Sequence, residues 1–412
     1  MPLEPGAPNF FHFAAQACNT TAFVRQKNFD VSGGASVSRE RAVAKAIGEA
    51  VERYCAAIYD IEELSLSDSN SLAFPHVEPE DFALYSDDQF QQTGFPWVKF
   101  DSKAAVRWTP AVDLSSGEEL LVPAALVFVP YHFYRGSGDS PIAQPISTGL
   151  ACHTNPAQAV LTAICEVIER DAFTITWQAE MAMPQIRVET LSDSAYDLVE
   201  RFERTGGKIV LLNLAMDHGV PTILSVLRTS APEGPALVFA AATSLDPERA
   251  VCSALEELAH TRRYSQQIKS RMRRLVTDAS YSNVIDQVDH LNLYCDHDNM
   301  PLADFIFSSS KRIDFHKIPD LSRGDPEQDV LAITQLINGI GHRVLMADIT
   351  TSDAREVGVT VVRALIPGFH PLFMGHAVRA LGGRRLWEVP QKLGCIGGLR
   401  NGSDNPAAHP YP

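Results

Sequence analysis

The 412-residue sequence lacks the features that define several large protein classes. It does not open with a basic segment followed by an apolar run. Its longest apolar stretches, such as residues 120–130, are far shorter than the ~20 residues of a membrane-spanning helix. The seven cysteines are scattered and form no C-x-x-C pair, which argues against structural zinc and a disulfide framework and indicates a reducing compartment. We therefore expect a cytoplasmic protein that does not bind membranes.

Positive charge and the common phosphate-binding motifs are also scarce. The formal net charge of -15 argues against binding to nucleic acid or to anionic membranes. The sequence contains no G-x-x-x-x-G-K-[ST] or G-x-G-x-x-G loop, no H-E-x-x-H pair and no G-x-S-x-G elbow. Any nucleotide site would therefore have to hold phosphates by carboxylates and metal ions.

Hydrophobic periodicity predicts a mixture of helices and strands. The expected helices cover residues 38–58, 156–178, 194–205, 246–274 with a break near Ser265, 326–340, and a segment near 374–381. The expected strands cover residues 108–112, 120–130, 208–214, 222–227, 237–243, 343–349 and 359–366, and residues 275–324 read as irregular. This mixture indicates an α/β (α+β) fold.

An internal repeat is the main chemical signal. Residues 45–54 read K-A-I-G-E-A-V-E-R-Y and residues 162–171 read T-A-I-C-E-V-I-E-R-D, so both contain A-I-x-E-x-(V/I)-E-R. At about 100° per residue, the first helix has an apolar stripe opposite its glutamates, made of Val43, Ile47, Ala50, Val51 and Tyr54. A charged face is usually just solvated, and two matching copies leave a solvated face and a shared site open as alternatives.

The repeat places Glu49 and Glu52 on one helix face and Glu166 and Glu169 on the other. If the two faces converge, four carboxylates repel one another unless a cation lies between them. Mg²⁺ prefers such hard oxygen ligands and in turn suits nucleotide phosphates. A further acidic cluster, residues 256–257, could join this site.

Several segments carry a resemblance to a known family. They are Gly33–Ser36, Gly48–Arg53, Ser147–Ala151, Ala159–Arg170, Ala254–His260 and Val361–Gly383. Together they resemble the YcaO family, and in particular the azoline-forming cyclodehydratases that act as the discrete D component of heterocycle synthetases for thiazole/oxazole-modified microcins. The resemblance implies a YcaO-like fold with pseudo-repeated helix and sheet subdomains around a carboxylate-lined Mg-ATP site.

The resemblance also implies roles for particular residues. The side chains expected to hold Mg²⁺ and the ATP phosphates are Glu49, Glu52, Glu166, Glu169 and Glu257, and Arg170 would neutralise phosphate charge. The family often has Asn and then Glu where this protein has Thr154 and Gln158. We expect Gln158 to hydrogen-bond a phosphate oxygen or a metal-bound water, without the charge of a glutamate.

The carboxyl-terminal residues resemble the P-x-P-x-P ending of azoline-forming members. Residues 408–412 read A-H-P-Y-P, so Ala408 replaces the first proline. By resemblance, the Pro412 carboxylate would reach the active site and move protons, as His260 could. We therefore divide the chain into an N-terminal extension (1–30), a YcaO domain (31–400) and a tail (401–412).

The expected activity is ATP-dependent conversion of Cys, Ser or Thr in a ribosomally made precursor peptide to thiazoline or oxazoline, by phosphorylation of a backbone amide. The implied partners are a leader-binding protein resembling ThiF-type adenylating enzymes, an FMN-dependent azoline dehydrogenase in some systems, and a second copy in a homodimer or a hetero-complex. The alternatives are backbone thioamide or amidine formation on the same site, a non-catalytic accessory protein, or an unrelated metal-binding α/β protein.

Overall fold

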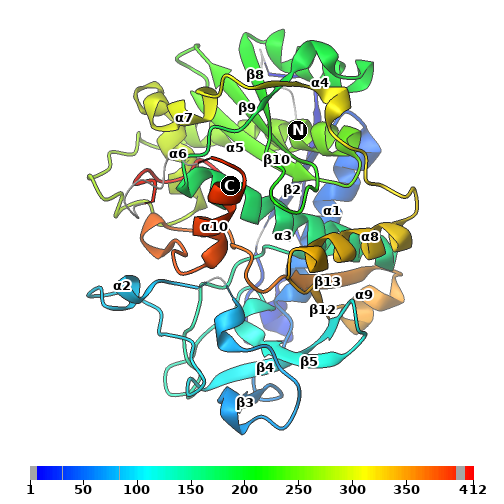
Figure 1. Ribbon diagram of the computed structural model, residues 1–412, viewed down its shortest axis with the longest axis vertical. Coiled ribbons are helices and arrows are strands. Elements are labelled where there is room, and N and C mark those ends of the chain that lie inside the picture. The colour runs from blue at the N-terminus through cyan, green and yellow to red at the C-terminus, as the bar shows by residue number, and fades with distance from the viewer. Residues whose placement is uncertain (1–6, 30, 83, 396–403) are drawn as a thin grey trace.

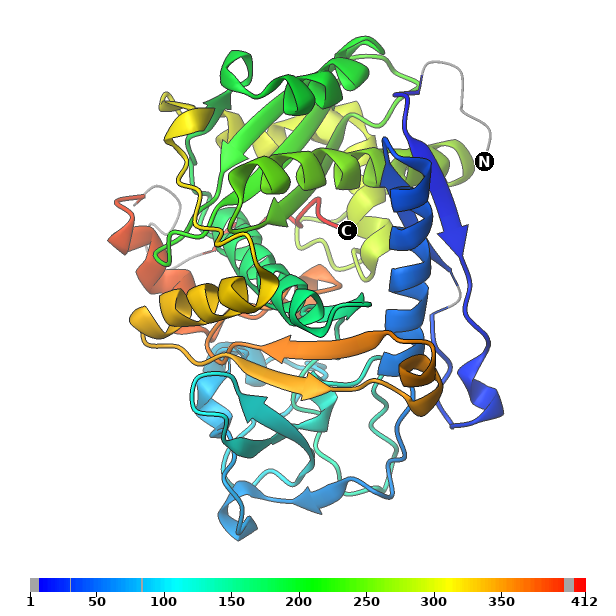
Figure 2. The same cartoon turned by 90° about the vertical axis from the view of Figure 1, so that its right-hand side faces the viewer.

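The computed structural model describes residues 7–29, 31–82, 84–395 and 404–412 (Figure 1). Two sheets form the body of the molecule, and helix α3 (Pro156–Gln178) runs between them. Figure 2 shows α3 lying between the strands that contain residues 207–243 and those that contain residues 345–365. A helix in this position contacts both sheets, and accordingly most residues of α3 are buried.

The first sheet has five strands in the order β10-β9-β8-β7-β11. Their bounds are Gln185–Arg187 (β7), Gly207–Asn213 (β8), Thr222–Thr229 (β9), Leu237–Thr243 (β10) and Arg312–Asp314 (β11). Neighbouring strands pair antiparallel except β11, which is parallel to β7. Helices α4 (Asp193–Glu203) and α5 (Pro247–Arg271) cover one face, and α3 packs on the other.

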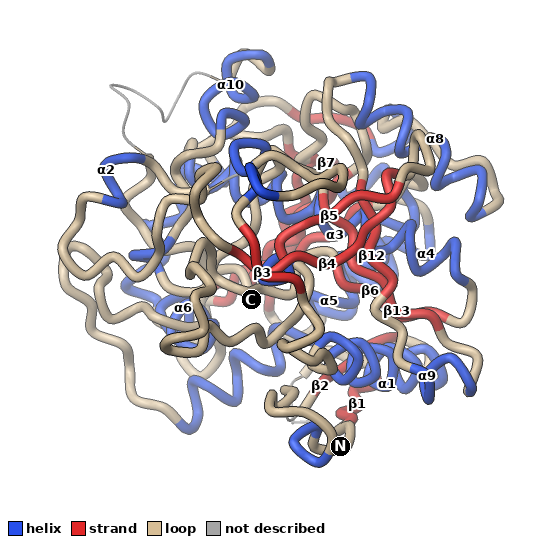
Figure 3. The backbone as a smooth tube through the Cα atoms, turned by 90° about the horizontal axis from the view of Figure 1, so that it is seen from below, coloured by secondary structure: helices blue, strands red, loops and turns tan. Residues whose placement is uncertain are grey.

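The second sheet is antiparallel and has the order β3-β4-β12-β13-β6, with β5 also paired to β4 (Figure 3). The strand bounds are Ser65–Ser67 (β3), Val106–Asp113 (β4), Glu119–Pro123 (β5), Leu150–His153 (β6), Leu345–Asp348 (β12) and Thr360–Leu365 (β13). One face packs against α3 and α8 (Pro326–Gly339) around a cluster of aliphatic side chains. Strand β13, which carries Arg363, therefore lies against α3.

Helix α1 (Arg39–Ala56) packs against the hairpin of β1 (Phe11–Ala15) and β2 (Ser32–Ser36). Its buried side is made of small residues, because Gly34 lies so close that a Cβ there would be 2.7 Å from the carbonyl oxygen of Ala42. The predicted apolar stripe is wrong in part: Ile47 is 53% exposed, whereas the Glu52 side chain is only 13% exposed. Glu52 of the acidic face thus points into the molecule, whereas the Glu49 side chain remains 38% exposed.

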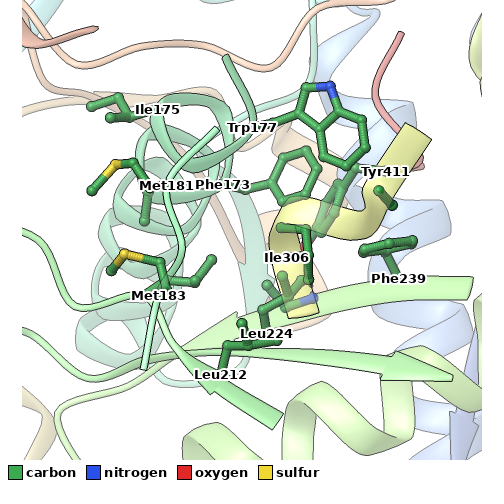
Figure 4. Packing of buried hydrophobic residues seen from close by; sticks show 14 of the residues in the cluster. Phe173, Ile175, Trp177, Met181, Met183, Leu212, Leu224, Phe239, Ile306 and Tyr411 are labelled. Carbon is green, nitrogen blue, oxygen red and sulfur yellow. Dashed lines mark hydrogen bonds between the residues drawn. The ribbon is translucent and has the colours of Figure 1, made fainter. Parts of the chain in front are cut away.

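The carboxyl-terminal residues 404–412 enter the largest hydrophobic cluster. Tyr411 packs on Phe173 of α3, with ring centroids 4.3 Å apart, and Trp177 and Phe239 lie in the same region (Figure 4). The indole nitrogen of Trp177 donates to the carbonyl oxygen of Ala407 at 2.9 Å. Residues 401–403 of the predicted tail, and residues 1–6 and 30 of the predicted extension, lie outside the described residues.

The mixed helix and strand prediction is confirmed, with four local corrections. The strand expected at 120–130 ends at Pro123, where a 3-10 turn (Ala124–Leu126) follows. The break expected near Ser265 is absent: α5 continues through Ser265, which is buried, to Arg271. The segment 275–324 contains α6 (Gln287–Cys295), α7 (Asp304–Phe307) and β11.

The fourth correction concerns residues 374–381, which form only a short 3-10 turn, because Gly375 adopts φ 95° and the chain then leads to α10 (Arg384–Lys392). Short helices α2 (Asp87–Phe90) and α9 (Ser352–Glu356) complete the α-helices of the described residues. Within the described ranges, no helix has the length and hydrophobicity needed to cross a bilayer.

Candidate active site

Helix α1 presents its two glutamates together with an arginine of its own. Arg53 lies 3.6 Å from Glu49 Oε1 and 3.3 Å from Glu52 Oε1. The second oxygen of Glu49 accepts a hydrogen bond from the backbone N–H of Gly33 at 3.0 Å. The β1–β2 hairpin therefore fixes one carboxylate of the pair, and Arg53 joins both.

Helix α3 repeats this arrangement. Arg170 lies 3.8 Å from Glu166 Oε1 and 3.4 Å from Glu169 Oε1, which matches the spacing of the first copy. Residues one turn apart on a helix lie on the same face, so the E-x-x-E-R pattern places each arginine over its own pair of carboxylates. The sequence repeat is thus a repeat of side-chain geometry.

The two pairs act on each other electrostatically. Burial raises the pKa of Glu52 to about 8, and the negative charges of Glu166 and Glu49 add to this rise, while Arg53 opposes it. Burial also raises the pKa of Glu166, and it raises that of Glu169 to about 7. The protein alone supplies too little positive charge to keep these carboxylates as acidic as they are in water.

Arg363 of β13 lies within the same charged group. It is 5% exposed, and its Nε and Nη1 have no hydrogen-bond partner among the described residues. Burial lowers the pKa of Arg363 to about 10, and the charges of Glu166 and Glu52 oppose that fall. Two buried N–H groups without an acceptor are costly, so they favour a bound acceptor from outside the protein.

Helix α5 adds a third acidic group, in which two adjacent glutamates have different roles. Lys45 Nζ lies 2.9 Å from Glu257 Oε1 and 3.0 Å from Glu256 Oε2. The Glu256 side chain is only 2% exposed and also accepts from the Ser36 hydroxyl, whereas that of Glu257 is 46% exposed. Burial would raise the pKa of Glu257, but Lys45 and then His260 outweigh it, and the pKa falls. Glu256 anchors the elements, and Glu257 is the available ligand.

His260 lies one turn beyond Glu256 and packs directly on Gly33. A Cβ at position 33 would be only 2.0 Å from His260 Cε1, so the position admits only glycine without rearrangement. Because the N–H of Gly33 binds Glu49, His260 lies at the edge of the carboxylate group. Gln158 lies about two turns before Glu166 on α3, and its amide nitrogen donates to Thr162 Oγ1 at 3.2 Å.

The carboxyl-terminal residues contact the α3 pair. The Tyr411 hydroxyl donates to Glu169 Oε1 at 2.7 Å and accepts from the N–H of Ala241 at 3.0 Å. The oxygen of Pro412 accepts from Arg170 Nη1 at 3.0 Å, and the Arg170 guanidinium lies 4.7 Å from the centroid of the Tyr411 ring. The end of the tail therefore sits at the carboxylates.

The donor set fits Mg²⁺ and phosphate, although it is not a preformed metal cage. Among the described residues, no three acidic, histidine or cysteine side chains surround a single point. The carboxylates contact Arg53, Arg170 and Lys45 instead. Phosphate oxygens would attract these cations. The carboxylates would then be free of their ion pairs, and they are hard ligands for Mg²⁺.

The structure brings together nearly all of the residues expected from the sequence. They are Glu49, Glu52, Glu166, Glu169, Arg170, Glu257, His260 and Pro412, and the role expected of Gln158 stays a prediction. Sequence reasoning missed Lys45, Arg53, Arg363 and Tyr411 as members of the site. Lys45 precedes Glu49 by one helical turn and Arg53 belongs to the repeat, so both carried a signal. Arg363 and Tyr411 lie on distant segments, and no local pattern pointed to their roles.

Known proteins share both sequence and fold with this one. A family model described as YcaO cyclodehydratase, ATP- and Mg²⁺-binding, matches residues 33–370. An uncharacterized protein of Methanothermobacter thermautotrophicus is 29% identical over 351 residues, which are 82% of this chain and 81% of that protein.

Three solved structures agree with the α+β fold. A heterocyclase in complex with substrate and cofactor has a TM-score of 0.77 and 21% identity, and covers 92% of this chain. This chain spans only 50% of that heterocyclase. YcaO from Methanopyrus kandleri, bound with AMPPCP and Mg²⁺, has a TM-score of 0.63 and 19% identity, and the match covers 86% of this chain and 84% of that one.

The third is a component of the E. coli microcin synthetase McbBCD complex, with a TM-score of 0.60 and 14% identity over 99% of this chain and 95% of that one. At these identities the structures show likeness of fold, whereas the family model covers most of the sequence and both carboxylate helices. The protein belongs to the YcaO family of ATP- and Mg²⁺-binding cyclodehydratases.

Proposed function

We propose that this protein converts Cys, Ser or Thr residues of a ribosomally made peptide to thiazolines or oxazolines, at the expense of ATP. One observation carries the proposal. Helices α1 and α3 each carry a pair of carboxylates bridged by an arginine, and the charge of Arg363 on β13 interacts with both pairs. Carboxylates and arginines are the groups that bind a metal ion and phosphates, and such a site suits a reaction between two bound substrates.

The reaction begins when the peptide's own thiol or hydroxyl attacks the carbonyl carbon of the preceding residue and gives a hemiorthoamide. Its oxyanion accepts the γ-phosphoryl group of ATP, and ADP is released. The new C–S or C–O bond has already closed the five-membered ring, so when phosphate leaves with the former amide oxygen and the amide nitrogen loses its proton, a C=N bond forms within that ring. An amide oxygen is a poor leaving group, and its phosphorylation removes that barrier.

The protein's own residues would bind and orient the two substrates. In this proposal Mg²⁺ is held by Glu49, Glu52, Glu166, Glu169 and Glu257, and it supplies neutralisation of phosphate charge. Arg170 pairs with a phosphate oxygen, as its raised pKa and its contacts with Glu166 and Glu169 allow. His260 and the oxygen of Pro412 are the groups proposed to move protons.

A pair of double variants tests the proposal. Helix α4 carries the same E-x-x-E-R pattern at Glu200, Glu203 and Arg204, on the exposed surface. Mg·ATP binding, measured by calorimetry, should be lost in Glu166→Gln/Glu169→Gln and kept in Glu200→Gln/Glu203→Gln. A folded wild-type protein that does not bind Mg·ATP would contradict the proposal. With a peptide substrate, the product should weigh one water less for each ring; a sulfur-for-oxygen exchange would indicate thioamide formation instead.

We also propose that the protein works with partners. The heterocyclase among the solved structures is in complex with substrate, and McbBCD is a multiprotein synthetase. These likenesses support a peptide substrate and a protein that captures its leader segment, and a dehydrogenase where azolines are oxidised. Size measurement of the purified protein alone, and after co-expression with candidate leader-binding proteins, tests this assignment.

A further inference from the structure

A hydrophobic pocket lies beside the carboxylate site. It opens between α3, β13, the loop after β13 and the segment around residues 143–148. Its apolar walls include Leu126, Val167, Ala364, Ile366, Phe369 and Leu372. The cavity has a volume of about 90 Å³. One water needs roughly 10–15 Å³ of cavity volume, so the pocket has room for one large aliphatic or aromatic side chain.

The pocket and the carboxylate site share a wall. Val167 follows Glu166 directly on α3, and Arg363 lines the pocket while its charge interacts with Glu166 and Glu52. The wall also uses Thr148, whose neighbour Gly149 adopts φ +87°. A Cβ on Gly149 would be 2.4 Å from the carbonyl oxygen of Ala364, so this glycine allows the start of β6 to lie against β13.

Two polar side chains of the lining have unused hydrogen-bonding capacity. Nε and Nη1 of Arg363 have no partner among the described residues, and neither has Nδ1 of His370. His370 Nε2 lies 3.4 Å from the carbonyl oxygen of Gly383, which can only accept, so the ring proton is on Nε2 and Nδ1 carries a free lone pair. Both residues are more than nine-tenths buried. The pocket thus offers donors and an acceptor in an apolar setting.

This combination matches a peptide residue. A backbone carbonyl can accept from Arg363, a backbone N–H can donate to His370, and an apolar side chain can fill the space between them. We propose that the pocket binds a large apolar residue of the substrate peptide, next to the amide that is modified. This inference rests on the proposed function, and it names a specificity element of the peptide beyond its Cys, Ser or Thr.

The experiment uses two small ligands as probes and a protein variant whose pocket is filled by a larger side chain. N-acetyl-L-leucine N′-methylamide carries the side chain and the two peptide groups, and N-acetylglycine N′-methylamide lacks the side chain. Binding of each to the full-length protein is followed by ligand-observed NMR. Ala143→Leu fills the pocket from its lining, and Ala380→Leu does so from the opposite segment if the first variant folds poorly. Ala332→Leu on α8 makes the same change outside the pocket. Mg·ATP binding is measured on every protein in parallel.

We expect the leucine probe to bind wild type and Ala332→Leu, and to bind Ala143→Leu at least about tenfold more weakly, because the apolar side chain loses its place. The glycine probe should bind wild type more weakly than the leucine probe. Mg·ATP binding should be the same in all three proteins. Arg363→Met should also weaken binding of the leucine probe.

Two results would overturn the pocket assignment. One is equal binding of the leucine and glycine probes. The other is loss of Mg·ATP binding in folded Ala143→Leu, which would assign the pocket to the nucleotide base. Binding of the leucine probe that Ala143→Leu removes, in a protein that binds no Mg·ATP, would support the pocket and overturn the proposed ATP chemistry instead.

Discussion

Three helices of this protein carry E-x-x-E-R, and only two of them build a site. On α1 and α3 the second glutamate of each pattern is buried: the side chains of Glu52 and Glu169 are 13% and 12% exposed, and burial raises their pKa values. On α4, Arg204 pairs with Glu200 at 2.5 Å as well, but the second glutamate, Glu203, is exposed. The motif alone therefore guarantees only a local ion pair. Its conversion into a binding site depends on the layer into which the helix is packed.

The largest expected effect is on ATP turnover, and it should separate an arginine of the site helix α3 from one of the exposed pattern on α4. Arg170→Met should lower peptide-dependent ATP turnover by about 10²-fold or more, because Arg170 lies among the carboxylates and would stabilise charge in phosphoryl transfer. Arg204→Met, in the exposed copy, should leave turnover within about twofold of wild type, since exposed ion pairs contribute little. ADP release with saturating peptide measures both. Equal losses in the two variants would refute the distinction.

Gly33 and Gly339 differ in the same way, because only Gly33 lies against another side chain. Gly33→Ala should lower ATP turnover by at least about tenfold and destabilise the fold by roughly 1–3 kcal/mol, because the new methyl group overlaps His260. Gly339→Ala at the end of α8 has no neighbour within 4 Å and should change stability by less than about 1 kcal/mol. Urea unfolding and ADP release measure these effects. The double variant Gly33→Ala/His260→Ala should recover much of the lost stability, and no recovery would show that the overlap is not the cause.

Glu52→Gln should stabilise the protein in the absence of nucleotide, by at least about 1 kcal/mol at pH 8.5, since each unit of pKa shift is worth about 1.4 kcal/mol. The folded-state pKa of Glu52, about 8, lies above its ordinary value of 4.5. The wild-type carboxyl is protonated in both states below pH 4.5, and its cost to folding grows as pH rises from 4.5 to 8.

The advantage of Glu52→Gln should therefore be absent below pH 4.5 and largest above pH 8. Glu200→Gln should change stability by less than about 0.5 kcal/mol at either pH. Urea unfolding at several pH values tests the prediction. A destabilised Glu52→Gln at pH 8.5 would contradict it.

The last comparison concerns the tail. Tyr411→Phe keeps the ring against Phe173 but removes the hydroxyl that donates to Glu169 and accepts from Ala241. We expect a loss of about 1–2 kcal/mol, because one buried N–H and one buried carboxylate oxygen lose their partner. Tyr196→Phe, on the exposed side of α4, is the matched change and should be nearly silent. Thermal unfolding compares them, and a silent Tyr411→Phe would show that water replaces the hydroxyl.

The sequence was sufficient for the features that repeat locally. Periodicity located α1, α3, α4 and the strands β8 to β10, since each is long and strongly patterned. It also located the glutamates of the site. It misassigned the environment of α1, where the small residues Ala42, Ala46 and Ala50 make the close contact and Ile47 remains exposed. Hydrophobicity alone predicts that isoleucine is buried before alanine. The close approach of the hairpin to α1, however, leaves room only for small side chains at the contact.

The remaining parts of the site depend on tertiary contacts. Arg363 faces the carboxylates only because β13 pairs with β6 and α3 crosses that sheet. Tyr411 reaches Glu169 only because residues 404–412 thread between α3 and β10. Gln158 shows the converse, since its place in a family motif predicted a role, while the described structure has its side chain bound to Thr162.

The threading of the last residues also has a consequence for biosynthesis. Ala407, Ala408 and Tyr411 belong to the same hydrophobic cluster as Phe173 and Phe239, which are translated far earlier. A ribosome releases the polypeptide from its N-terminal end, so the cluster stays open until Tyr411 has emerged. A product that stops short of Tyr411 lacks both the closing side chain and the hydroxyl on Glu169. Loss of Tyr411 would therefore open the hydrophobic cluster and leave Glu169 without its partner in one step, so a single side chain serves both the core and the site.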